Sequence, residues 1–147
     1  MNKRYYSLGL MSGTSLDGID ASIIVSNGEN DLEIIDNYGG TPAGNLAEYY
    51  AGMAYLNLKN YEQAIAYLDK FKSEDDALAP MAKGAIGDAF MQLNQDDQAL
   101  DYYLQATNLR QNEFTTPTFL YKAGVTALNS GNASKALELF NKIKDLK

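Results

Sequence analysis

The chain contains no cysteine and no histidine among its 147 residues. Without cysteine it cannot form disulfides, use thiol chemistry or hold a metal through thiolates. Without histidine it lacks the side chain that most often serves as a general base near neutral pH and as a metal ligand. We therefore expect no cofactor and no metal site, and any chemistry would have to rest on Asp, Glu, Lys, Tyr, Ser or Thr.

Basic residues are also scarce. The sequence has 12 Lys and Arg against 19 Asp and Glu, for a formal net charge of −7. Nucleic acids and anionic membranes attract proteins through basic patches, so this charge argues against both as partners. The apolar stretch after Lys3 and Arg4 is interrupted by Ser7, Gly9 and Ser12, and no 18-residue apolar span follows. The sequence thus predicts neither a signal peptide nor a membrane anchor, and we expect a cytoplasmic protein.

The residues that are present form two halves with different patterns. Three apolar runs separated by turn-rich stretches occupy the first 38 residues: Tyr5–Leu10, Ile19–Ser26 and Leu32–Tyr38. This pattern predicts a short β-meander, which would need another surface to pack against. From Gly39 onward, Ala, Leu, Tyr and Lys recur at helical spacing. We therefore expect a boundary between a segment 1–38 and a helical domain 39–147.

Helix starts and turns can be placed in the second half. Thr41 before Pro42, and Thr116 before Pro117, fit an N-cap followed by the first helical position. The expected helices pair roughly as 43–58 with 61–72, 77–93 with 96–108, and 117–129 with 133–145. The tight turns within the pairs are expected at Lys59-Asn60, Asn94-Gln95 and Gly131-Asn132. Asn and Gly tolerate the left-handed conformation that such turns need, whereas Lys is less suited to it.

An internal repeat organises these helices. Gly52, Gly87 and Gly124 are 35 and 37 residues apart, and an alanine follows each glycine after twelve residues: Ala64, Ala99 and Ala136. We expect the small residues of paired helices to face each other, so that the two backbones approach closely. Large residues one turn away would fill the flanking gap, and those on the second helices are Leu68, Tyr103 and Phe140.

The repeat resembles the tetratricopeptide repeat family. The resemblance is strongest in Ala51-Gly52-Met53-Ala54-Tyr55 and Tyr61-Glu62-Gln63-Ala64. It weakens at the family's tryptophan position, which holds Glu48, Lys83 and Leu120, and the family's late proline is absent. The fold that this resemblance implies is mainly α, with three helical hairpins at roughly 45–78, 80–113 and 117–147 in a right-handed α-solenoid.

By the same resemblance, the first helix of each hairpin lines a concave groove that binds a protein or peptide partner. The groove residues would be Tyr49, Met53, Leu56, Met81, Asp88, Met91, Tyr121 and Val125. Methionine adapts its shape to a partner, and tyrosine joins a large apolar ring to a polar tip. The alternative is that several of these residues pack against the N-terminal segment or a second copy of the chain.

Some members of this family hold a partner's C-terminal carboxylate with Lys and Asn side chains. The corresponding positions here are Tyr49, Met53, Ala85 and Thr118, and only the neighbouring Lys122 is basic. We therefore expect an apolar or mixed partner rather than an acidic chain end. The acidic stretches Glu74-Asp75-Asp76 and Asp96-Asp97 lack the spacing of a calcium loop, so we expect them to support helix N-termini instead.

The segment Gly9–Asp20 is the one stretch that suggests chemistry. Its strand, glycine- and hydroxyl-rich loop and second strand could cradle a phosphate, although a plain hairpin turn has the same composition. Residues 1–38 resemble the opening of anhydro-N-acetylmuramic acid kinases, which implies a phosphate loop at Ser12, Gly13, Thr14, Ser15 and Asp17. Nothing after residue 38 matches the rest of such a kinase, and one loop alone cannot transfer phosphate. We therefore expect a vestigial loop without catalysis, and a join between unrelated sequences near Tyr38-Gly39.

Three hypotheses for the function follow from these patterns. The first is a non-catalytic scaffold that binds other proteins. The second is an ATP-binding fragment related to the kinase of cell-wall sugar recycling. The third is a purely structural module that forms a homo-oligomer through its exposed apolar surface.

Overall fold

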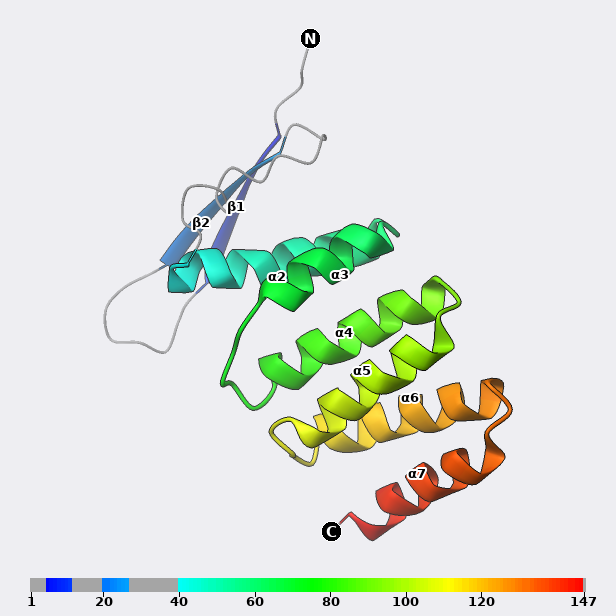
Figure 1. Cartoon of the computed structure of the whole chain (residues 1–147). Coiled ribbons are helices and arrows are strands. Elements are labelled where there is room, and N and C mark those ends of the chain that lie inside the picture. Colours follow the sequence, from blue (N-terminus) through cyan, green and yellow to red (C-terminus); the bar gives the residue numbers. More distant parts are fainter. Residues whose placement is uncertain (1–4, 12–19, 27–39, 147) are drawn as a thin grey trace. The chain divides into compact units, whose positions relative to one another are not determined.

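The computed structural model of the chain describes residues 5–11, 20–26 and 40–146. The chain divides into two compact units, Met1–Ala47 and Glu48–Lys147, which are described separately. The fold is mainly α, with six helices in these described ranges (Figure 1). They are α2 (Pro42–Asn57), α3 (Tyr61–Lys70), α4 (Leu78–Gln92), α5 (Asp96–Asn108), α6 (Thr115–Asn129) and α7 (Ala133–Asp145).

The N-terminal unit contains a pair of antiparallel strands, β1 (Tyr5–Met11) and β2 (Asp20–Ser26). Tyr5 lies opposite Ser26, and Met11 lies opposite Asp20. These strands coincide with the first two apolar runs. The third run lies outside the described residues, so the meander as a whole stays a prediction.

Several helix starts depend on a side chain that accepts backbone hydrogen bonds, whereas α5 has no such cap. Thr41 Oγ1 accepts from the backbone N–H of Gly44 at 3.1 Å, so the predicted cap of α2 is confirmed. Asp75 Oδ1 accepts from the N–H groups of Ala77 and Leu78, both at 2.8 Å, at the start of α4. Both hydrogen bonds lower the pKa of the Asp75 carboxyl, and the bond from Leu78 has the larger effect. The acidic loop therefore supports a helix N-terminus as expected.

The predicted cap at Thr116 is wrong. Helix α6 begins at Thr115, and Asn112 Oδ1 accepts from the N–H groups of Phe114 and Thr115 at 3.0 and 2.8 Å. Thr116 Oγ1 instead accepts from the N–H of Asn112 at 2.9 Å. The two residues cap the helix reciprocally, because Asn112 can reach the first free N–H groups whereas Thr116 already lies inside the first turn.

All three predicted turns have the same backbone geometry. Lys59, Asn94 and Gly131 have positive φ angles of 62°, 57° and 79°. The next residue in each turn donates its N–H to the carbonyl five residues back at 2.8 to 2.9 Å: Asn60 to Tyr55, Gln95 to Phe90, and Asn132 to Ala127. This Schellman arrangement ends the first helix of each hairpin and requires a left-handed residue at the position that Lys59 occupies in the first turn.

The repeated glycines allow close packing within each hairpin, but not in the way expected. The alanines are buried, yet the side chains that cover the glycines are Leu68 on Gly52, Tyr103 on Gly87 and Phe140 on Gly124. A Cβ atom at Gly52 would lie 2.5 Å from Leu68 Cγ, and one at Gly87 would lie 2.6 Å from Tyr103 Cε1. The large residue therefore rests on the glycine itself rather than in a flanking gap, so the space of a methyl group is already filled.

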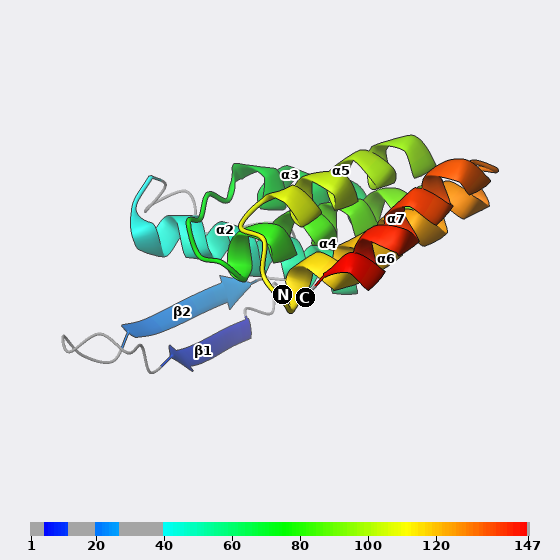
Figure 2. The ribbon, with the colours of Figure 1, turned by 90° about the horizontal axis from the view of Figure 1, so that it is seen from below.

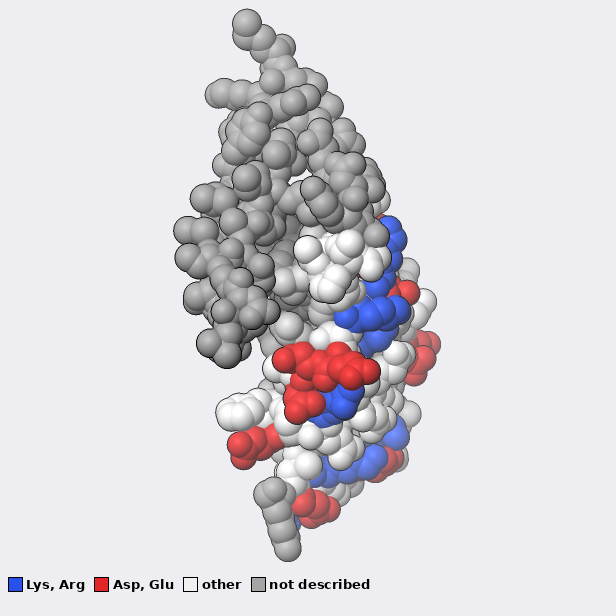
Figure 3. All heavy atoms as spheres, turned by 90° about the vertical axis from the view of Figure 1, so that its left-hand side faces the viewer, with Lys and Arg blue, Asp and Glu red and all other residues white. Residues whose placement is uncertain are grey.

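In the C-terminal unit, α3, α4, α5 and α6 each pack against the next helix, as Figures 1 and 2 show. Two core clusters form, one centred on Leu68 and Ile86 and the other on Tyr103, Phe119 and Leu139. Acidic and basic side chains are interspersed on the face shown in Figure 3. None of the helices in the described part of the chain is long and apolar enough to cross a bilayer.

Candidate protein-binding groove

A hollow of about 610 Å³ lies along the first helices of the three hairpins. Helices α2, α4 and α6 supply most of its wall, and the turn into α3 and helix α5 supply the rest. The lining residues are Leu56, Asn57, Lys59, Tyr61, Asp88, Met91, Gln92, Tyr103, Tyr121, Lys122, Val125 and Thr126. Each first helix ends in the same kind of turn. Residues that are 35 or 37 positions apart, and so occupy equivalent positions in successive hairpins, therefore lie along one surface.

Five of the eight predicted groove residues line this hollow: Leu56, Asp88, Met91, Tyr121 and Val125. The other three lie elsewhere. Tyr49 is only 5% exposed, and its ring packs on Phe71 with centroids 5.0 Å apart. Met53 is half-buried against the first core cluster, and Met81 is exposed but does not line the hollow. Tyr49 therefore belongs to the core of the repeats rather than to the groove.

Three lining residues, Lys59, Tyr61 and Tyr103, were not predicted, because they come from a turn and from second helices. The Tyr61 hydroxyl donates to Gln92 Oε1 at 3.4 Å and joins the first hairpin to the second at the edge of the hollow. Thr126 Oγ1 contacts Met91 Sδ at 3.4 Å. A sequence pattern that assigns the groove to first helices alone gives no signal for Tyr61 or Tyr103.

Three polar side chains that line the hollow, Asp88, Tyr103 and Lys122, bind one another. Lys122 Nζ on α6 donates to both carboxylate oxygens of Asp88 on α4 at 2.7 Å, and the Tyr103 hydroxyl donates to Asp88 Oδ1 at 2.6 Å. Burial, followed by the hydrogen bond and charge of Asp88, raises the pKa of Tyr103, which keeps its proton. Lys122 also lies 5.7 Å from the ring centroid of Tyr103 and 5.8 Å from that of Phe119.

This arrangement limits the chemistry that the groove can offer. Lys122 is the basic residue that the sequence singled out, and its charge is matched by Asp88. A partner's carboxylate would have to compete with that ion pair. The walls are formed by apolar parts of Leu56, Met91 and Val125. No group of three or more acidic side chains placed to hold a metal occurs within the described residues.

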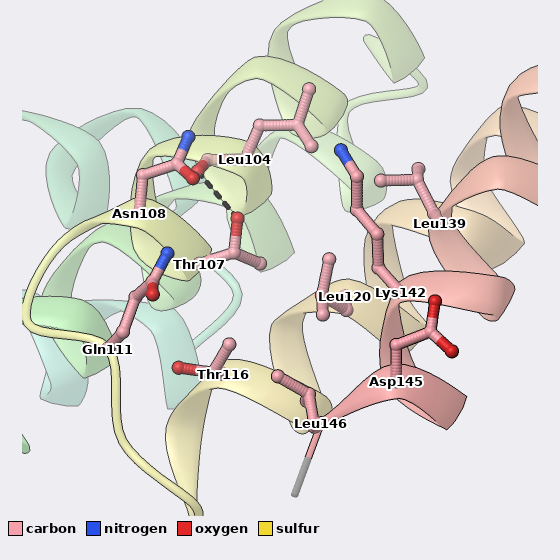
Figure 4. Close-up of a pocket in the computed structure, with 10 residues that line it drawn as sticks. All are labelled: Leu104, Thr107, Asn108, Gln111, Thr116, Leu120, Leu139, Lys142, Asp145 and Leu146. Atoms are coloured by element: carbon pink, nitrogen blue, oxygen red, sulfur yellow. Dashed lines mark hydrogen bonds between the residues drawn. The ribbon is translucent and has the colours of Figure 1, made fainter.

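A second, smaller hollow of about 350 Å³ lies between α5, α6 and α7. In Figure 4, Leu104, Leu120 and Leu139 form an apolar floor, while Lys142 and Asp145 stand at the rim on α7. Asn108 and Gln111 border it from the end of α5 and the following loop. The predicted phosphate-loop residues Ser12, Gly13, Thr14, Ser15 and Asp17 lie outside the described residues, so the phosphate loop stays a prediction.

The kinase resemblance has a counterpart among known proteins. An anhydro-N-acetylmuramic acid kinase of Pelagibacter ubique is 50% identical to this chain over 66 residues, which are 44% of this chain and 15% of the kinase. The matched span is longer than the 38 residues expected from the sequence. The chain covers only about 15% of that curated relative's length, so the resemblance shows shared sequence and no activity.

The helical repeat has counterparts of two kinds. Family models described as tetratricopeptide repeat match residues 46–76 and 82–113. A crystal structure of nearly identical TPR-like repeats from Podosopora anserina, described as those of a kinesin light chain, superposes with a TM-score of 0.57 at 14% identity. It covers 71% of this chain and 55% of that one. At this identity the likeness concerns the fold alone. These matches show tetratricopeptide repeats at residues 46–76 and 82–113, and the structural likeness shows a similar helical repeat fold.

Proposed function

We propose that this chain is a non-catalytic scaffold that binds a peptide segment of another protein in the groove along α2, α4 and α6. Tetratricopeptide repeats imply a protein-interaction scaffold, because stacked hairpins present an extended surface formed by successive repeats. The observation that carries the proposal is that five predicted groove residues, from three successive hairpins, meet in one hollow of about 610 Å³.

The lining of the groove supports a partner that is apolar or mixed in character. Leu56, Met91 and Val125 offer apolar area, and methionine can adjust to irregular shapes. Tyr121 is 60% exposed and adds a large ring with a polar tip, a residue type that is enriched at binding hot spots. Because Asp88 neutralises Lys122, the groove should recognise an internal segment without needing a terminal carboxylate.

The proposal can be tested by selecting peptides that bind the full chain from a random library. We expect the selected peptides to carry apolar or aromatic residues and to bind equally well with a free or an amidated C-terminus. Met91→Glu should abolish their binding, because it buries a charge in the groove wall. Leu137→Glu is the matched control, because Leu137 is 62% exposed on α7 and does not line the groove. Peptides that bind Met91→Glu normally, or that lose binding on amidation, would contradict the proposal.

The match to the kinase favours a second candidate, a nucleotide-binding fragment. We place this candidate below the scaffold, because phosphoryl transfer depends on several elements positioned together and the chain covers 15% of the kinase. In this proposal, the N-terminal part of the chain derives from the kinase and the helical part forms a separate repeat domain. A thermal-shift titration of the full chain with Mg-ATP distinguishes the candidates. Absence of stabilisation at millimolar nucleotide eliminates the fragment hypothesis, whereas a concentration-dependent rise in Tm would support it.

A further inference from the structure

The groove along α2, α4 and α6 carries more positive than negative charge, although the chain as a whole is acidic. The charged residues that line it in the described part of the chain are Lys59, Asp88 and Lys122. The formal net charge of the chain is −7, from 19 Asp and Glu against 12 Lys and Arg. A local excess of positive charge favours a negatively charged group of a partner at this place.

The two lysines of the groove differ in what they contact. Lys122 Nζ donates to both carboxylate oxygens of Asp88 at 2.7 Å, so its charge is matched within the chain. Lys59 is exposed in the turn between α2 and α3, and it forms no ion pair with any residue that the structure describes. The carboxylate of Glu62, three residues further along, does not line the groove. The charge that remains for a partner is therefore that of Lys59.

Lysine is an unfavourable residue at this turn position. Lys59 has a φ of 62°, and the equivalent positions of the other two turns hold Asn94 and Gly131. Asparagine and glycine adopt the left-handed conformation more readily than lysine does. Residues held in such conformations are concentrated at functional sites. The positive charge thus stands where the turn alone favours another residue, which is a reason independent of the charge count to give Lys59 a role in binding.

The groove is polar where the first hairpin forms its wall. Asn57 lines it two residues before Lys59, and Gln92 of α4 is joined to this hairpin by the hydrogen bond that its Oε1 accepts from the Tyr61 hydroxyl. The amide groups of Asn57 and Gln92 can donate hydrogen bonds to a carboxylate. Met91, next to Gln92, supplies apolar surface. A segment that fits both parts carries an acidic side chain close to apolar ones.

We propose that the segment bound in the groove carries an Asp or Glu side chain that forms an ion pair with Lys59, close to the apolar residues that contact α4 and α6. This inference rests on the proposed scaffold function and adds the charge of the partner to it. A single ammonium group on a flexible stem pairs with a carboxylate wherever the two can meet. An acidic side chain within the segment is therefore sufficient, and no chain end is needed.

The inference is tested by selecting peptides from one random library in parallel against the full chain and its variants. The wild type should select peptides in which Asp or Glu is enriched at one position close to apolar residues. In Lys59→Asn this acidic enrichment should disappear while the apolar preference stays, and in Lys59→Arg both should persist. In Lys59→Glu, basic residues should replace the acidic ones. Lys144→Asn is the matched control, because Lys144 is exposed on α7 and does not line the groove, and it should select the same peptides as the wild type.

Lys59→Asn separates binding from folding. It places in the first turn the residue that adopts a φ of 57° in the second, Asn94, so it should fold at least as stably as the wild type, which urea unfolding checks. One selected peptide is then titrated with its acidic residue replaced by the corresponding amide. We expect about a two- to fivefold loss of affinity on the wild type at low ionic strength, and none on Lys59→Asn. The loss should vanish near 1 M salt, where the screening length is about 3 Å.

The possible failures of this inference and of the groove proposal can be told apart. Selected peptides that share an apolar preference but no acidic position would overturn the inference and leave the groove proposal standing. Acidic enrichment that persists in Lys59→Asn would also overturn it, because another residue would then hold the carboxylate. Peptides that bind Met91→Glu as well as the wild type would contradict the groove proposal, and the inference would fall with it.

Discussion

Replacing Gly87 with alanine should destabilise the protein, although alanine is the better helix former. A Cβ atom at this position would lie 2.6 and 2.7 Å from Cε1 and Cδ1 of Tyr103. Carbon atoms in contact are usually about 3.5 to 4.0 Å apart, so the ring would have to move by about 1 Å. The ring cannot move freely, because it is 3% exposed and its hydroxyl is bound to Asp88 at 2.6 Å.

The sign of the effect depends on two opposing contributions. Overpacking of this kind costs about 1 to 3 kcal/mol. The gain in helix propensity from Gly to Ala is about 1 kcal/mol. We therefore expect Gly87→Ala to lower the free energy of unfolding by up to about 2 kcal/mol. Because the hydrogen bond to Asp88 restrains the Tyr103 ring, we expect a value near the upper end of this range.

The measurement is urea unfolding followed by far-UV circular dichroism, with an unchanged m-value as the condition for comparison. Ala66→Gly is the control for helix propensity, because Ala66 is exposed on α3. Gly87→Ala should also become less harmful, or stabilising, when Tyr103 is replaced by alanine. If Gly87→Ala instead stabilises the wild-type chain by as much as Ala66→Gly destabilises it, the close-packing argument is wrong.

Three further predictions concern turns and caps. Gly131→Ala should lower the free energy of unfolding by about 1 kcal/mol, because φ is 79° and the added Cβ meets nothing within 4 Å that could compensate for the strained backbone. Lys59→Gly should raise the free energy of unfolding by a similar amount, because Lys59 has a φ of 62° that glycine adopts without strain. Urea titration of both variants checks the opposite signs. Asn112→Ala should cost about 1 to 2 kcal/mol through loss of the α6 cap, with the exposed Asn108→Ala close to neutral, and equal losses in the two would refute the assignment. The pKa of Asp75 is lowered by folding, so its contribution is present above the ordinary carboxyl range and is lost as the pH falls through the lowered value. The stability difference between wild type and Asp75→Ala should therefore be constant near neutral pH and shrink in acid, and a difference that grows in acid would contradict it.

The local features of the helical half could be predicted from the sequence because they depend on neighbours in the chain. The sequence pattern places the ends of the helices to within two residues, and the turn residues Lys59, Asn94 and Gly131 all adopt positive φ. Asp75 caps its helix as its position suggested. The cap at Thr116 was predicted wrongly, because the helix already begins at Thr115 and Asn112 accepts from the N–H groups at its start.

The candidate groove could be predicted only in part. Repeat register places Leu56, Asp88 and Met91 on one surface, but it does not say which equivalent residues are buried. Tyr49 and Tyr121 occupy the same repeat position, yet Tyr49 is buried in a cluster with Phe71 and Ala82, whereas Tyr121 is 60% exposed. The ion pair between Asp88 and Lys122 likewise joins residues of different hairpins that no local pattern links.

Helical periodicity, turn residues and the repeated glycines are thus encoded in segments of a few residues, where hydrogen bonding and backbone conformation are settled locally. Only the tertiary structure shows that Leu68, Tyr103 and Phe140 lie directly on those glycines. The physical reason is that packing fills the volume between two elements jointly. A residue's burial therefore depends on the helix placed against it, which lies outside its own stretch of sequence.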